Sequence, residues 1–169
     1  ALVESKRAVA VLGNHEINLL REDAKEGSGW FFGSRREKDH AKFEPYEKVS
    51  DSARERIVLF LASLPVGLER ADLRVIHAAW MTEQIDVARR LPLGTFRERY
   101  EEWEKAAKPH AIETEIEIRM AKDLDSWEHN LDDPMKVPPF LTAVAEHDVN
   151  MQMMNPLKVL TSGVEREAI

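Results

Sequence analysis

Apolar and polar residues alternate with different periods along the chain, and these periods predict its secondary structure. The apolar run that closes residues 7–12 predicts a short buried strand, which Gly13 ends. The segment LRVIHAAW predicts a second strand through Ile76 that ends at His77. A later apolar stretch, LKVL at 157–160, predicts a last strand. Strands are therefore expected near both ends of the chain.

A helical period separates these strands. Over residues 51–64 apolar side chains recur at i, i+3, i+4 and i+7, Ser52 and Glu55 have the spacing of a capping box, and Pro65 follows. Before this helix, the polar and glycine-rich residues 24–50 predict a long loop, and loops of that length are often functional. The first half of the chain thus has an α/β pattern.

Residues 85–150 have a mainly helical pattern. Thr95, with a glutamate three residues later, has the signature of a helix start, and Pro109 is expected to interrupt that helix. A second helix is expected over residues 111–127 and a shorter one over 139–148. This region is therefore interpreted as a helical insertion or cap between parts of a sheet.

The pattern predicts three parts. A core portion occupies residues 1–84, the helical region 85–150, and a return to the core 151–169. The chain of 169 residues begins without Met, has no signal peptide and ends without an obvious terminator, so we expect an internal fragment of a longer protein.

Composition narrows the classes of function. The net charge of −7 argues against a nucleic-acid-binding protein, although a bound metal ion could still attract a phosphorylated substrate. The chain has no cysteine, which excludes disulfides and thiolate metal sites and favours a reducing, cytoplasmic location. No apolar run approaches the roughly 20 residues of a membrane helix, so no membrane partner is expected.

Groups able to handle a metal or a proton follow the first predicted strand, in the sequence GNHE. Gly13 allows a sharp turn and a close approach of a ligand to the backbone. Asn14 offers a neutral oxygen ligand, and His15 offers either a metal ligand or a proton donor. Glu16 can orient a neighbour or favour the start of a helix.

A second histidine has a position comparable to that of the GNHE residues, directly after a predicted strand. His77 follows the second predicted strand, and active sites of layered α/β proteins gather at such strand ends. Each residue alone has a simpler interpretation, His77 as a hydrogen-bonded side chain and Asn14 as a turn residue. Together, they predict that two distant segments converge on one cation.

The GNHE sequence, followed downstream by a strand ending in HA, resembles the calcineurin-like metallophosphoesterases, which include Ser/Thr protein phosphatases and diadenosine tetraphosphatases. The segment EGSGWFFGSRRE is similar to an aromatic–glycine segment of that family. The resemblance covers about residues 7–80, with LKVLTSG as a later strand, and suggests a bacterial member. It implies an α/β fold, part of a β-sandwich flanked by helices with a mainly helical insertion.

The resemblance also implies roles for individual residues. Asn14 and His77 would be ligands of one ion in a centre of two divalent metals, expected to be Mn²⁺, with Fe or Zn as alternatives. His15 would donate a proton to the leaving-group oxygen or stabilise the phosphoryl oxygens. The reaction would be hydrolysis of a phosphate ester by a metal-activated water, on a phosphoprotein, a dinucleoside polyphosphate or a small phosphoester.

Much of the family pattern is absent from these residues. The Asp-x-His and Gly-Asp-x-x-Asp-Arg-Gly segments and the closing Gly-His do not occur in the chain. An Asn and one or two imidazoles cannot hold two dications tightly without a bridging carboxylate. We therefore expect the fragment alone to be almost inactive, and its unpaired strand edges to favour self-association.

Further candidates and alternatives remain open. Arg35 and Arg36 follow the aromatic–glycine segment and could contact a phosphate, although a solvated basic loop is the simpler interpretation. The amphipathic helices around 95–130 also suit a non-catalytic helical interaction module on a phosphatase-like core. A two-metal nuclease is a third possibility, against which the acidic charge argues.

Overall fold

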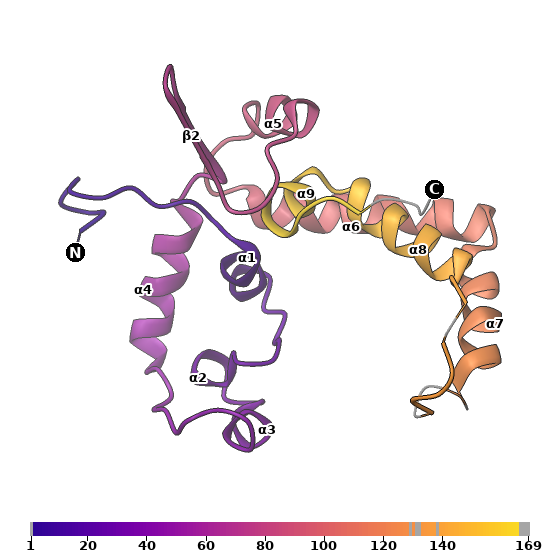
Figure 1. The fold of residues 1–169 in the computed structure, drawn as a ribbon. Helices are drawn as coiled ribbons and strands as arrows, with labels where there is room; N and C mark the ends of the chain where they lie inside the picture. The colour runs from indigo at the N-terminus through magenta and orange to yellow at the C-terminus, as the bar shows by residue number, and fades with distance from the viewer. Residues whose placement is uncertain (1, 129, 131–132, 138, 166–169) are drawn as a thin grey trace.

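The computed structural model describes residues 2–128, 130, 133–137 and 139–165, in which helices predominate and one small sheet occurs (Figure 1). The elements follow one another along the chain as α1 (Asn14–Leu20), α2 (Gly29–Phe32), α3 (Arg36–His40), α4 (Asp51–Ala62), β1 (Gly67–Arg70), β2 (Leu73–Ile76), α5 (Thr82–Ala88), α6 (Phe96–Glu113), α7 (Ile116–Glu128), α8 (Thr142–Met153) and α9 (Pro156–Ser162).

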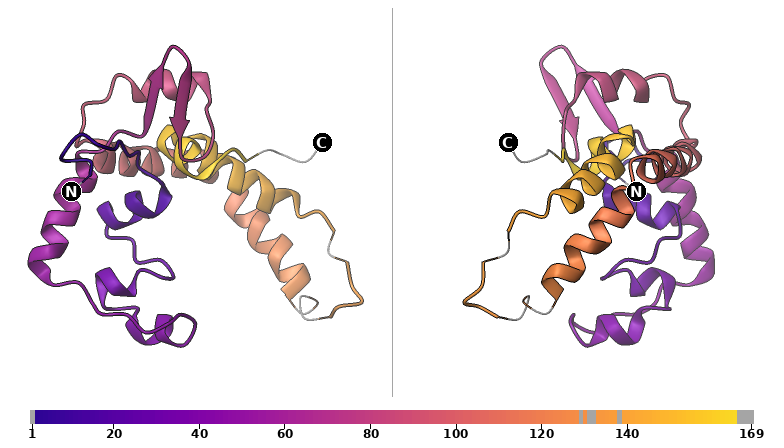
Figure 2. Two further views of the ribbon diagram at one scale, coloured as in Figure 1. Left: turned by 60° about the vertical axis from the view of Figure 1, so that its left-hand side comes forward. Right: turned by 90° about the vertical axis from the view of Figure 1, so that its right-hand side faces the viewer.

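Two limbs extend from a common junction, as the views in Figures 1 and 2 show. Helices α1 to α4 form the first limb, and α7, α8 and the later part of α6 form the second. The hairpin of β1 and β2, with α5 and α9, lies where the limbs meet. The two segments that carry the candidate site, before α1 and after β2, both belong to this junction.

The hydrophobic core lies in the junction and reaches into the first limb. Ile17 and Leu20 of α1 pack with Phe31 of α2 and with Leu157 and Leu160 of α9 in one cluster of buried side chains. Leu157 and Leu160 have no exposed surface, so α9 is the most deeply buried helix of this cluster. Its burial holds the C-terminal segment against the GNHE corner.

The prediction of a strand over residues 157–160 is wrong, because these residues belong to α9. Asn155 caps the helix, since its side-chain oxygen accepts the backbone N–H of Lys158 at 3.2 Å. Pro156 occupies the first turn, where its fixed φ suits a helix and its missing N–H costs nothing. A short apolar run does not distinguish a buried helix from a buried strand, and the Asn-Pro start decides here.

The prediction of a strand over residues 7–12 is also wrong. Residues 8–13 are extended or irregular, and the described contacts include one backbone hydrogen bond from this segment across the chain, from Leu12 N–H to the Pro65 carbonyl at 2.8 Å. Val9 keeps 75% of its surface exposed. A strand needs a ladder of hydrogen bonds to a neighbour, and no such ladder forms here within the described residues.

The sheet consists of β1 and β2, which pair antiparallel with Gly67 opposite Ile76 and Arg70 opposite Leu73. The strand predicted to end at His77 is thereby confirmed as β2, which ends at Ile76. The chain combines helices with a small sheet, so the α/β expectation holds at that coarse level. Among the described residues no β-sandwich forms.

Helix boundaries follow the sequence signals with some corrections. The cap of α4 is Ser50 instead of Ser52, because the Ser50 hydroxyl accepts the Ala53 N–H at 3.3 Å. Pro109 lies within α6 and does not interrupt it. The chain breaks later, at Glu115, whose φ of 53° lies in the left-handed region. The loop predicted over 24–50 contains α2 and α3.

Candidate functional site

The GNHE corner joins the extended segment to α1. The Gly13 N–H donates to Oε2 of Glu16 at 3.0 Å, and the Ile17 N–H donates to the Gly13 carbonyl at 3.1 Å. The carboxylate thus satisfies a backbone donor that the start of a helix leaves unpaired. Asn14 is partly buried and His15 is exposed, so both can meet a ligand from solvent.

His77 is fixed from the other side by the hairpin and by α9. The pairing of Ile76 with Gly67 sets the end of β2, and the N–H of Ala78 donates to the Leu160 carbonyl at 3.2 Å. The backbone on both sides of His77 is therefore hydrogen-bonded. Its side chain remains exposed.

The structure brings the two motifs together at Gly13. A Cβ atom added to Gly13 would lie 2.7 Å from Nδ1 and Cε1 of His77 and 2.8 Å from Oε2 of Glu16. The imidazole ring and the carboxylate are therefore neighbours above the same glycine. Two segments separated by residues 14–76 meet at this point, which only a residue without a side chain permits.

Three side chains at or next to this corner have groups that can bind a cation. Glu16 offers a carboxylate, His77 an imidazole, and the next residue to Gly13, Asn14, an amide oxygen. No three His, Asp or Glu side chains gather into a metal-binding group in the described part of the chain. The described residues alone therefore do not fit a centre of two divalent ions.

The structure does not bring Arg35 and Arg36 to this corner. Arg35 precedes α3 and its Nε lies 3.6 Å from Oδ1 of Asp39, while Arg36 begins α3 and is exposed. Figures 1 and 2 place α3 at the end of the first limb that lies farthest from β2. The ion pair with the buried Asp39 therefore assigns Arg35 to stabilising the structure of this loop.

Asp39 is a buried carboxylate that sequence reasoning missed. Its Oδ2 accepts the Gly29 N–H at 2.7 Å and lies 3.5 Å from the Tyr46 hydroxyl. Burial raises the pKa of Asp39, but the hydrogen bonds from the Gly29 and Gly27 amides and the charge of Arg35 outweigh it, so the pKa lies below its usual value. The glycine spacing of EGSGWFFG was the available signal, because these amides surround the carboxylate.

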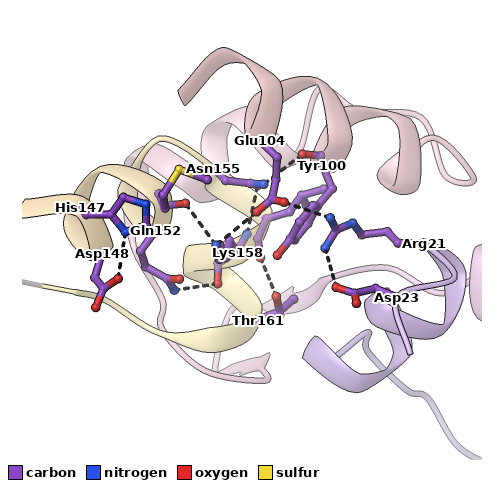
Figure 3. Close-up of polar contacts among 12 residues, drawn as sticks. Arg21, Asp23, Tyr100, Glu104, His147, Asp148, Gln152, Asn155, Lys158 and Thr161 are labelled. Atoms are coloured by element: carbon purple, nitrogen blue, oxygen red, sulfur yellow. Dashed lines mark hydrogen bonds and ion pairs between the residues drawn. The ribbon is translucent and has the colours of Figure 1, made fainter. Parts of the chain in front are cut away.

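A polar network ties the end of α1, in the first limb, to α6 and α9 (Figure 3). We call it the junction network, and it consists of Arg21, Tyr100, Glu104, Asn155 and Lys158. The Glu104 carboxylate accepts hydrogen bonds from Arg21 Nη2 at 3.0 Å and from Lys158 Nζ at 3.2 Å. The buried Asn155 amide donates to the Tyr100 carbonyl at 3.1 Å. Residues from α6, α9 and the end of α1 are thereby tied together.

Tyr100 shows how strongly this region is desolvated. Its burial, reinforced by the nearby charge of Glu104, raises the pKa of the phenol to about 12. The Arg21 guanidinium lies over its ring, 4.1 Å from the centroid. Every charge of the network has an opposite partner, so we interpret it as a structural joint.

Comparison of the chain with family models, with curated proteins and with solved structures gives no significant match. The resemblance to metallophosphoesterases therefore rests on the residues of the two motifs. In the ranges that the structure describes, no helix has both the length and the apolar character needed to cross a bilayer.

Proposed function

We propose that this chain supplies one corner of the active site of a metal-dependent phosphoesterase. The observation that carries the proposal is the contact of the His77 ring with Gly13 of the GNHE sequence. The ring comes from a distant part of the chain and lies against the buried glycine between the extended segment and α1. The convergence expected from the two motifs is the arrangement that such a site requires.

In this proposal each residue has a defined task. Asn14 and His77 are neutral ligands of a divalent cation, with Mn²⁺ favoured and Fe or Zn as alternatives. His15, exposed on the first turn of α1, donates a proton to the leaving-group oxygen. A bound cation supplies positive charge and acidifies a water molecule. Carboxylate ligands from residues outside this chain would complete the centre, and in this proposal the chain is one part of a larger metallophosphoesterase β-sandwich.

The substrate is a phosphate ester in this proposal. The net charge of −7 would repel a phosphate, so the local positive charge has to come from the metal ions. A phosphoprotein, a dinucleoside polyphosphate and a small phosphoester all remain candidates.

The test uses the complete gene product that contains this chain, with added MnCl₂ and p-nitrophenyl phosphate. We expect Asn14→Ala and His77→Ala each to lower kcat/KM for p-nitrophenyl phosphate strongly, because each removes a metal ligand. We expect His15→Ala to lower kcat/KM by about 100-fold or more for ethyl phosphate, because its alkoxide leaving group needs a proton donor. His110→Ala, an exposed histidine of α6, is the matched control. Full activity in all three site variants would refute the assignment.

A second candidate function is a non-catalytic helical interaction module. The second limb favours it, because Ile112 of α6 is 68% exposed and Ile118 of α7 is 69% exposed. Exposed apolar side chains on helices often mark protein-binding surfaces. A complete gene product without metal-dependent hydrolysis, but with a binding partner lost on Ile118→Asp, would favour this module.

A further inference from the structure

A cavity of about 400 Å³ lies beside β1, between α5 and the chain that leads into α6. Its walls are more apolar than polar, and the apolar side chains that line it include Val66, Trp80, Ile85, Leu91 and Phe96. Binding sites for small molecules usually have volumes of about 300–1,000 Å³ and apolar walls. This cavity therefore has the size and lining of a site for a small apolar group.

Charged residues at the cavity are already paired. The Glu69 carboxylate forms ion pairs with Arg74, whose Nε lies 2.9 Å away, and with Arg89. Arg89 also forms an ion pair with Asp86 at 2.7 Å. The Arg74 guanidinium also lies over the Trp80 ring, 4.9 Å from the centroid. No lone charge is offered to a ligand by these side chains, which favours a neutral ligand.

The cavity lies close to the candidate site. Its wall includes Pro65, whose carbonyl accepts the Leu12 N–H at 2.8 Å, immediately before Gly13. Trp80, which also lines the cavity, follows His77 by three residues, which even in extended form span at most about 10 Å. One small molecule can therefore reach both the cavity and the corner.

We infer that this cavity binds a neutral aromatic group, which Trp80 and Phe96 suit through ring contacts. The inference rests on the proposed function in one respect: in the proposed reaction, the aromatic group is the part of the phosphate ester next to the phosphate. Leu93, 60% exposed at the cavity, becomes covered when the group binds. The cavity would thus set the substrate preference of the corner.

The kinetic test compares benzyl phosphate with ethyl phosphate on the complete gene product. Both esters release an alcohol, so their difference reports the group bound in the cavity. Leu93→Asp should lower kcat/KM for benzyl phosphate about tenfold through KM and leave that for ethyl phosphate unchanged. Leu59→Asp, at a 72% exposed leucine of α4, is the matched control. Where the wild-type protein hydrolyses both esters, an equal effect of Leu93→Asp on both, or none on either, overturns the inference.

A binding test separates this inference from the proposed function. Saturation-transfer NMR with 4-fluorobenzyl alcohol, which has no phosphate, should show binding to the wild-type protein and to Leu59→Asp but not to Leu93→Asp. If the probe binds in this way and no phosphate ester is hydrolysed, the aromatic site stands and the proposed function fails. If esters are hydrolysed and the probe does not bind, the inference fails alone.

Discussion

At the scale of single residues, Gly13 determines whether the two motifs can meet. Its φ of −107° is accessible to any residue, so its need for glycine comes from crowding by the His77 ring and the Glu16 carboxylate. The sequence analysis expected a glycine that permits close approach. The structure identifies the approaching groups as side chains of this chain.

We predict that Gly13→Ala lowers the free energy of unfolding by about 1 kcal/mol, because the His77 ring and the Glu16 carboxylate have to move away from the added methyl group and the contact of Glu16 with the Gly13 N–H is weakened. The added methyl group would lie 2.7 Å from the His77 ring and push it away from the corner. Chemical denaturation measures the loss, and the chemical shifts of the imidazole report the displacement. Gly67→Ala is the control, since its Cβ would make an ordinary contact of 3.5 Å. Equal stability of both variants would contradict the crowding.

At the scale of elements, the predictions from the sequence are right for helices with a strong apolar period. They are wrong where contacts with distant residues, which the local pattern does not show, decide the structure. The helix α4 and the strand β2 were found because their signals lie within a few residues. Residues 7–12 were misassigned, because an apolar run does not show whether a partner strand will lie beside it. The sequence predicts that Asn14 and His77 converge on one cation, and the structure places Gly13, the neighbour of Asn14, against the His77 ring. The buried Asp39 was not expected, since its burial depends on distant amides.

Helix α9 illustrates how a cap can decide between strand and helix. We predict that Asn155→Ala lowers the free energy of unfolding by about 2–3 kcal/mol, because it removes both the cap and a buried hydrogen bond to Tyr100. Ser50→Ala, which removes the exposed cap of α4, should cost about 1 kcal/mol. Urea denaturation compares the two. Equal losses would mean that the contact with Tyr100 contributes nothing.

At the scale of the whole molecule, the two limbs keep their relation through the core around α9 and the junction network (Figure 3). Glu104 is central, because it bridges Arg21 at the end of α1 and Lys158 of α9, and its side chain is only 24% exposed. The same joint supports the segments on which Gly13 and His77 lie. The geometry of the proposed site therefore depends on contacts outside it.

We predict that Glu104→Gln lowers the free energy of unfolding by about 2 kcal/mol, because two partly buried cations lose a charged partner. Amide hydrogen exchange should rise in α1 and α9 together, since the lost contacts join these two helices. Glu102→Gln is the control, because Glu102 pairs with Arg99 on the surface, where such a pair contributes at most about 1 kcal/mol. Faster exchange in only one of the two helices would show that Glu104 does not tie α1 to α9, and the proposed site would then have to be held together by the apolar core alone.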